Sequence, residues 1–272
     1  MAMFFFATMD ATVKHLVKLY PTVQVVWARF FFHLLLIVVV FARRIPTIAR
    51  TAHPGLQFFR SILMILTTGL FFTGLIYVPL VNAASMMLVS PLIVTALSMP
   101  ILREPVGIRR WAGVIVGFGG ALIIIRPTGD FQLAILFPLC AAASYAVYQV
   151  STRFLSQSDP VLTTLFYTAA MGAVIPAFAV PFVWVTPTPQ DWGLMMFTGI
   201  CGGLGHFAVI RAFAAAPAAA VAPFSYTAII WATTFGFILF GDFPDHWTII
   251  GAAIIVASGL YVFFREKKRG QK

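Results

Sequence analysis

The chain has 272 residues, of which 61% are hydrophobic and only 10% are charged. An ordinary soluble domain carries about 25% charged residues, so this composition excludes that class and predicts an integral membrane protein. The net charge of +10 comes from basic residues spread over several loops and a tail, which argues against nucleic-acid binding. The two cysteines, Cys140 and Cys201, lie in separate apolar runs, so neither a disulfide framework nor a cysteine-based metal site is expected.

A membrane-spanning helix needs about 20 apolar residues, and ten segments come close to that length. In chain order they are residues 2–17, 22–42, 56–77, 82–102, 108–125, 132–152, 161–184, 192–214, 219–240 and 247–264. Backbone in lipid must satisfy its own hydrogen bonds, so these continuously apolar runs predict helices and not barrel strands. The first segment lacks the basic start and cleavage site of a signal peptide and is interpreted as the first span.

The basic residues of the loops predict the orientation of the chain. They lie in alternate connections and in the tail: Arg43, Arg44 and Arg50; Arg103, Arg109 and Arg110; Arg153; and Arg265, Lys267, Lys268, Arg269 and Lys272. With ten spans, all four groups fall on one side of the membrane, and that side is cytoplasmic by the positive-inside rule. Both termini are therefore expected in the cytoplasm, with residues 265–272 as a basic cytoplasmic tail.

The second half of the chain repeats the pattern of the first. One offset pairs Pro79 with Pro217, Ala84 with Ala222, Thr95 with Thr233, Glu104 with Asp242, Gly113 with Gly251 and Leu122 with Leu260. Each copy, residues 1–126 and residues 132–264, holds five hydrophobic segments, so the second copy must enter the membrane inverted. The prediction is an all-α integral membrane protein with ten transmembrane helices in two inverted five-helix repeats, an arrangement typical of secondary transporters.

Ionisable side chains within a span are costly and are candidates for function. Asp10 and Lys14 lie in the first span, Arg29 and His33 share a face of the second, and His206 lies in the eighth. We expect a polar cavity between the halves in which these groups bind a charged substrate or a proton. The alternative is that Asp10 and Lys14 neutralise each other while Arg29 extends towards the interface.

Aromatic and amide side chains form a second group of candidates. Tyr145, Tyr148 and Gln149 cluster on the sixth span, opposite Asp10 under the repeat. A small-molecule site is mostly apolar with a few placed polar groups, so this cluster can line one. Further candidates near helix breaks are Trp27, Tyr226 and Trp231. An aromatic residue at the end of a span also fits a belt at the membrane interface, and that alternative stays open.

Proline and glycine indicate where helices break and where they approach. Pro91 and Pro223 lie inside the fourth and ninth spans, so their effect is either a carbonyl exposed to substrate or a simple bend. Two glycine pairs at four-residue spacing favour close helix packing, namely Gly113 with Gly117 and Gly199 with Gly203.

Glu104 and Asp242 follow matching spans of the two copies. We expect each carboxylate to cap the helix that comes next, with a direct substrate or proton role as the alternative. Asp245 is a similar candidate for the last span.

These features together resemble the EamA family of the drug/metabolite transporter superfamily over essentially the whole chain. The resemblance is carried by MDATVK, by YVPLVNAASMMLVSPLIVTAL followed by LREP, by GVIVGFGGALIIIRP, and by the second copy from APAAAVAP to IIGAAIIVASGLYV. The first and last parts look most like the branch with bacterial S-adenosylmethionine-uptake-like and riboflavin-transporter-like members. The second copy departs from the pattern, with Ile229 opposite Pro91 and with Asp242 where the family commonly has glutamate.

The resemblance implies alternating access in a bacterial cytoplasmic (inner) membrane, with a small-molecule metabolite as cargo and a monomer or homodimer as the unit. Integral-membrane enzymes, channels and scaffolds are the competing classes, but the polar groups are scattered singly and form no catalytic or metal-binding cluster. No cofactor or metal is expected. Without a nucleotide-binding motif, exchange or proton coupling is favoured, with Asp10 as the proton-coupling candidate beside His33 and His206.

Overall fold

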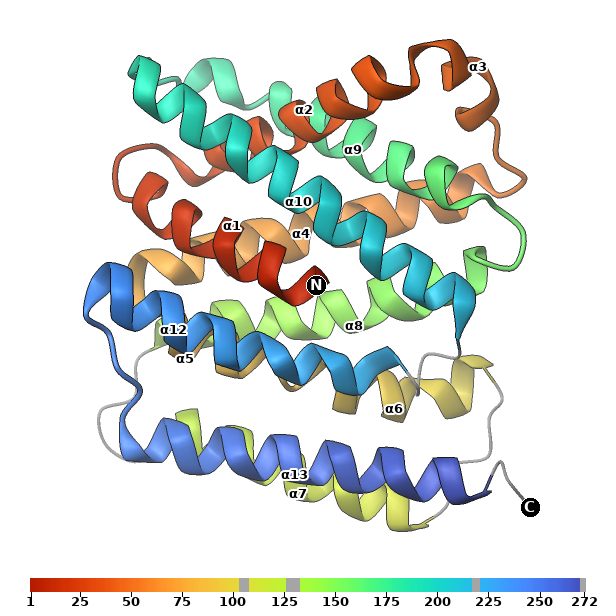
Figure 1. Ribbon diagram of the computed structural model, residues 1–272, viewed down its shortest axis with the longest axis vertical. Coiled ribbons are helices and arrows are strands. Elements are labelled where there is room, and N and C mark those ends of the chain that lie inside the picture. Colours follow the sequence, from red (N-terminus) through yellow and green to blue (C-terminus); the bar gives the residue numbers. More distant parts are fainter. Residues whose placement is uncertain (103–107, 126–132, 217–220, 270–272) are drawn as a thin grey trace.

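The computed structural model describes residues 1–102, 108–125, 133–216 and 221–269, and every regular element in these ranges is a helix (Figure 1). The first half contains α1 (Ala2–Leu16), α2 (Thr22–Phe41), η1 (Ala42–Arg44), α3 (Ile45–Ile48), α4 (Pro54–Tyr77), α5 (Leu80–Met87), α6 (Ser90–Leu102) and α7 (Ile108–Ile125). The second half contains η2 (Leu133–Ile135), α8 (Leu136–Leu155), α9 (Val161–Ala177), η3 (Val180–Phe182), α10 (Pro189–Ala215), η4 (Ala222–Thr227), α12 (Ala228–Phe240) and α13 (His246–Arg269).

Seven helices in the described ranges are long and apolar enough to cross a membrane. Two more apolar helices, Trp111–Ile125 and Phe224–Phe240, are shorter, and α1 has 15 residues. Large apolar side chains cover the outside of the bundle, with Phe182, Val39 and Phe237 at 86%, 70% and 59% exposure. A surface of this kind is stable in lipid and not in water, so the structure is that of a multi-pass membrane protein.

Two of the expected spans are not continuous α-helices. The fourth is divided at Leu88 and Val89 into α5 and α6, and the turns there close through bonds to the third preceding carbonyl. In its described part, the ninth contains the 3-10 helix η4 directly before α12, which begins at Ala228. Pro91 and Pro223 lie at the start of α6 and η4, where a proline cannot donate the backbone hydrogen bond that an uninterrupted helix requires. The sequence had left open an exposed carbonyl or a simple bend at these prolines, and in the structure the α-helix is interrupted beside each of them.

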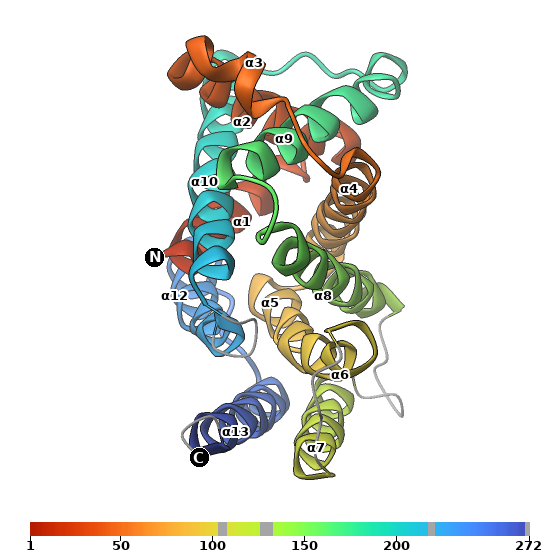
Figure 2. The ribbon, with the colours of Figure 1, turned by 90° about the vertical axis from the view of Figure 1, so that its right-hand side faces the viewer.

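The helices of the two halves interleave. α4 packs along α8, α1 along α10, and α2 along α9. Figures 1 and 2 show α7 and α13 side by side at one end of the molecule, with α2 and α9 at the other. The contacts between residues 1–126 and residues 133–264 are therefore the main packing interfaces.

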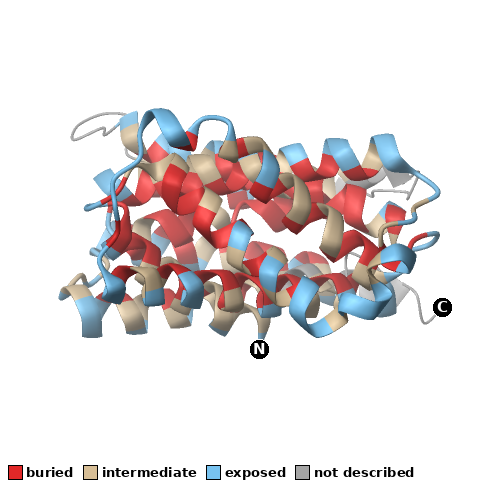
Figure 3. Cartoon of the chain, turned by 90° about the horizontal axis from the view of Figure 1, so that it is seen from above, coloured by how far each residue is buried: buried red, intermediate tan, exposed pale blue. Residues whose placement is uncertain are grey.

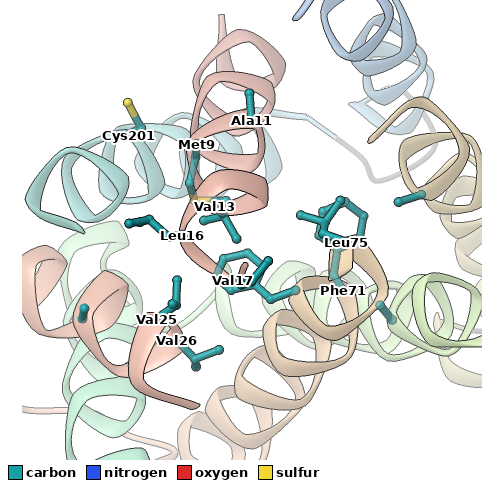
Figure 4. Close-up of a cluster of buried hydrophobic side chains, with 14 of the residues drawn as sticks. Met9, Ala11, Val13, Leu16, Val17, Val25, Val26, Phe71, Leu75 and Cys201 are labelled. Carbon is teal, nitrogen blue, oxygen red and sulfur yellow. The ribbon is translucent and has the colours of Figure 1, made fainter. Parts of the chain in front are cut away.

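The largest apolar cluster lies where α1, α2, α4 and α10 meet (Figure 4). Val13, Leu16, Val25 and Leu75 are completely buried there. Seen from above, buried residues fill the centre of the bundle and exposed ones its outside (Figure 3). This apolar packing holds α1 against α4 and α10, and so sets the depth at which the polar residues of α1 and α2 lie.

Candidate functional site

A cavity lies at the centre of the bundle, among α1, α2, α4, α5, α6, α8, α10 and the start of α12. Its volume of about 110 Å³ is enough for several water molecules. Both broken helices border it, the first through Leu88, Ser90 and Pro91 and the second through Ser225 and Ala228. Most of the wall is apolar, with polar groups at a few points, as in small-molecule sites.

Asp10 of α1 lies in the wall of this cavity. Its Oδ1 atom is buried and has no hydrogen-bond partner among the described residues. Arg29 is near enough for the two charges to interact through space, but the described part of the chain contains no salt bridge between them. The sequence had left open a pair between Asp10 and Lys14. In the structure, Lys14 pairs with Asp242 instead, and Asp10 lies in the cavity wall.

Arg29 of α2 lies in the wall as well and is 2% exposed. Its guanidinium donates to Thr68 Oγ1 at 2.6 Å, to Met9 Sδ at 3.2 Å and to His206 Nε2 at 2.8 Å. It also lies 4.5 Å from the centre of the Phe30 ring. Arginine has no acceptor, so His206 Nε2 must accept, and the proton of a neutral His206 is on Nδ1. Arg29 is thus buried within the bundle and does not extend to the interface.

Arg60 of α4 continues this network, although the sequence reasoning did not select it. It is fully buried, and it donates to Thr152 Oγ1 at 2.7 Å, Thr168 Oγ1 at 2.7 Å and Tyr148 Oη at 2.9 Å. Tyr148 in turn lies 3.4 Å from His206 Nδ1, which donates to it. The signal that could have indicated Arg60 is its position, because it is an arginine one turn inside an expected span.

Of the three candidates on α8, two border the cavity and the third, Tyr148, lies behind them. Tyr145 and Gln149 border the cavity, and Gln149 Nε2 donates to Ser90 Oγ at 2.9 Å. Tyr148 stacks on Tyr145 with ring centres 5.6 Å apart and supports it from behind. His33 lies behind His206, with the rings stacked at 6.4 Å, and does not border the cavity.

Three expected cavity residues lie elsewhere. Trp27 stacks on Phe31 at 4.9 Å and contacts Trp184, in an aromatic group that matches the belt alternative. Trp231 contacts Phe4, and neither residue borders the cavity. Tyr226 is buried against Gly259 of α13. Helix rotation decides these positions, because a residue one or two places along a helix faces a different neighbour.

Of the acidic residues expected as caps, Asp245 caps its helix as expected, and Asp242 has another partner. Asp242 Oδ2 forms a 2.5 Å ion pair with Lys14 Nζ, which links the end of α1 to the connection between α12 and α13. The N-terminus of α13 is capped by Asp245, whose carboxylate accepts from the backbone N–H of Thr248 at 2.8 Å. Asp245 lies close enough to the first turn to reach its free N–H groups, whereas Asp242 is three residues earlier. Glu104 lies outside the described residues.

A polar cluster joins two connections at one end of the bundle. The carboxylate of Asp159, between α8 and α9, accepts from Thr51 Oγ1, from Gln57 Nε2 at 2.8 Å and from the backbone N–H of Ala52 at 3.3 Å. Burial acts to raise the pKa of Asp159, but these three hydrogen bonds outweigh it and hold that pKa below its usual range. The ionised carboxylate therefore fastens the α3–α4 connection to the α8–α9 connection.

Fold and site together define a multi-pass helical membrane protein with a central cavity between its two halves. The cavity wall is mostly apolar and has polar groups at a few points. The sequence matches the EamA-like transporter family over residues 1–126 and 132–264, and the chain belongs to this family.

Two curated relatives carry transporter names. An S-adenosylmethionine uptake transporter of Rickettsia prowazekii is 27% identical over 260 residues, covering 95% of this chain and 88% of the relative. A riboflavin transporter of Vibrio cholerae is 32% identical over 226 residues, covering 82% and 76%. A solved crystal structure with 17% identity has a TM-score of 0.72 and covers 100% of this chain and 98% of its own, which shows a shared fold.

Proposed function

We propose that this protein is a secondary transporter that carries a small organic metabolite across the bacterial cytoplasmic membrane by alternating access. The observation that carries the proposal is the central cavity, with Asp10 and Arg29 in its wall and a broken helix from each half at its edge. Irregular backbone at membrane depth is tolerated where it lines a cavity, and carriers bind cargo at such places. The names of the two curated relatives agree with this class.

The proposed architecture is ten helices in two inverted five-helix repeats. Under the sequence offset, α4 corresponds to α10, and α8 to α1. The packing follows this correspondence, because α4 packs on α8 while α10 packs on α1. The helices that correspond to each other at the two ends, α2 with α9 and α7 with α13, pack in pairs. Such packing supports an approximate two-fold axis through the cavity, about which the halves can rock.

Transport is proposed to occur by exchange or by proton coupling, with Asp10 as the proton carrier. His206 is less suited, because its Nε2 atom accepts from Arg29 at 2.8 Å and a proton there would break that bond. Asp10 has a buried oxygen without a partner in the described residues, so it can gain a proton without breaking any bond. A neutral Asp10 and a charged one also differ in their attraction to Arg29, which gives the two protonation states different preferred arrangements.

Counterflow in proteoliposomes tests the transport function. The purified chain, preloaded with unlabelled S-adenosylmethionine or riboflavin, is expected to accelerate uptake of the same labelled compound. Exchange distinguishes a carrier from a channel, and recovery of unaltered compound distinguishes it from an enzyme. If neither probe exchanges, the proposed function fails for the metabolites that the relatives' names suggest.

Asp10→Asn tests the coupling. The variant is expected to retain exchange at equal pH when the cargo concentration is raised to offset weaker binding, and to lose accumulation driven by a pH gradient. Accumulation that persists in the variant, with only stability reduced, would show that Asp10 is structural.

A further inference from the structure

The cavity contains one acidic and one basic group that face the same space without pairing. Asp10 and Arg29 both border it, and their charges interact through space. No described residue donates to Asp10 Oδ1. The acceptors around Arg29 are a hydroxyl, a thioether and an imidazole, all uncharged in the arrangement above. Buried charges are usually paired because desolvation is costly, so two opposite charges left apart in one cavity form a site for a ligand that carries both.

On the basis of the transport function proposed above, we propose that the cargo carries an amino-acid group, with its ammonium bound by Asp10 and its carboxylate by Arg29. A guanidinium has five N–H donors, and the hydrogen bonds of Arg29 to Met9, Thr68 and His206 use three, which leaves one on each terminal nitrogen. Thr67 Oγ1, buried in the same wall and without a partner in the described ranges, is a further polar contact.

Arg60 explains why a cargo that has a carboxylate is favoured over a cargo that is only a cation. Arg60 has no acidic partner among the described side chains, and it reaches the cavity only through Tyr148 and His206. The neighbourhood therefore contains two guanidinium groups and one carboxylate. A cargo with only a positive charge would meet uncompensated repulsion, whereas a zwitterion satisfies both ends of the cavity.

The rest of the cargo must fit an apolar wall. Met3, Met9, Met64 and Met87 border the cavity together with Phe6, Phe71 and Phe72. Thioether side chains adapt their shape and make favourable contacts with aromatic rings. The remainder attached to the amino-acid group is thus expected to contact an apolar wall that can adapt its shape.

Paired probes test this assignment on the purified full-length chain. S-adenosylmethionine carries the ammonium and the carboxylate, and decarboxylated S-adenosylmethionine lacks the carboxylate. Both compounds share a sulfonium cation, so the pair differs only in the carboxylate, and riboflavin has neither an ammonium nor a carboxylate. Wild-type protein is expected to bind the first compound at least about tenfold more tightly than the second. Arg29→Gln is expected to weaken S-adenosylmethionine and to abolish this preference. Asp10→Asn is expected to weaken both adenosyl compounds by a similar factor and to preserve the preference.

Arg211→Gln is the matched control, because Arg211 is exposed on the same α10 that carries His206 and does not border the cavity. It is expected to bind all probes as the wild type does. Thermal unfolding of each variant confirms that the fold is retained. If Arg29→Gln does not fold, the preference of the wild type between the two adenosyl compounds tests the assignment without that variant.

Three results would overturn the inference. The first is equal affinity of the wild type for both adenosyl compounds, and the second is a uniform loss in Arg29→Gln with the preference intact. The third is exchange of riboflavin with no binding of S-adenosylmethionine or of a panel of free amino acids. That last result would leave the proposed transport function standing, whereas exchange of no probe at all would contradict the transport function itself.

Discussion

Arg60 and Asp159 show how individual buried polar residues hold this bundle together. Arg60 bonds side chains of α8 and α9 from its place on α4, and Asp159 bonds the connection that precedes α4. Neither residue has an ionic partner of opposite charge within the described ranges. Each charge is therefore stabilised by several hydrogen bonds to neutral groups. Losing one of these bonds is costly, because the buried charge would then lack a partner.

Replacing Arg60 by glutamine is expected to lower the free energy of unfolding by about 2 kcal/mol, because hydrogen bonds within membrane proteins are worth about 1 kcal/mol each. Tyr148 would lose one donor, so the affinity for cargo is expected to fall as well. Thermal unfolding in detergent measures the first effect. Arg50→Gln, at an exposed position, serves as the control, and equal stability of the two variants would contradict the prediction.

Asp159 predicts a dependence of stability on pH. Its pKa is lowered on folding, so its contribution is complete at neutral pH and is lost as the pH falls through the lowered value. Asp159→Asn is expected to be less stable than the wild type at pH 7. The difference should shrink in the acidic range below about pH 4. A difference that stays constant from neutral to acidic pH would show that the charge of Asp159 has no role.

At the scale of whole helices, the two halves are connected by close contacts of glycine and, among the described residues, by one ion pair. The side chain of Val262 occupies the space beside Gly113, and that of Phe32 occupies the space beside Gly199. These contacts confirm the expected close packing at both glycines. The crossing of α7 and α13 is closer still, because Gly120 and Gly251 face each other's backbone. Glycine allows this approach since it has no Cβ atom.

Gly120→Ala is expected to destabilise the protein by about 2 kcal/mol, as overpacking does elsewhere. The added Cβ would lie 2.7 Å from the carbonyl oxygen of Gly251, and backbone cannot move aside as a side chain can. Gly119→Ala is the matched control on the same helix, because nothing lies within 4 Å of its Cβ position. Chemical unfolding of both variants tests this, and equal stabilities would contradict the proposed contact.

The Lys14–Asp242 ion pair connects α1 of the first half to the last connection of the second. Asp242 is 31% exposed, so the coupling energy is expected to be about 1 kcal/mol. Lys14→Met, Asp242→Asn and the double variant form a cycle that measures it by thermal unfolding. If the pair also holds one side of the cavity closed, both single variants will exchange cargo faster. Strictly additive effects would show that the pair contributes nothing.

At the scale of the whole molecule, the proposed orientation predicts which loops face the cell exterior. Both termini and Glu104 are expected in the cytoplasm, and the connection that contains Asp242 is expected outside. In a background without Cys140 and Cys201, a membrane-impermeant thiol reagent should label Phe243→Cys in intact cells. Glu104→Cys should be labelled only after the cells are permeabilised. Equal labelling of both positions in intact cells would contradict the topology.

The sequence by itself determined the membrane class, the helical segments and the family, because apolar runs and their spacing are local properties of the chain. It also indicated Asp10, Arg29, His206, Tyr145 and Gln149, since ionisable and polar groups at membrane depth are visible in one dimension.

The tertiary structure alone decided which of these groups meet. Arg60 belongs to the hydrogen-bond network behind the cavity, whereas Trp27, Tyr226 and Trp231 contact residues away from it. The sequence could not predict this, because the rotation of each helix depends on packing against distant segments. The partner of Lys14 was likewise unpredictable. Asp10 lies one turn away in sequence, but the fold brings Asp242, 228 residues later, to 2.5 Å. Spacing along a helix indicates which side chains can be adjacent, but only the packing between helices determines which of them are in contact.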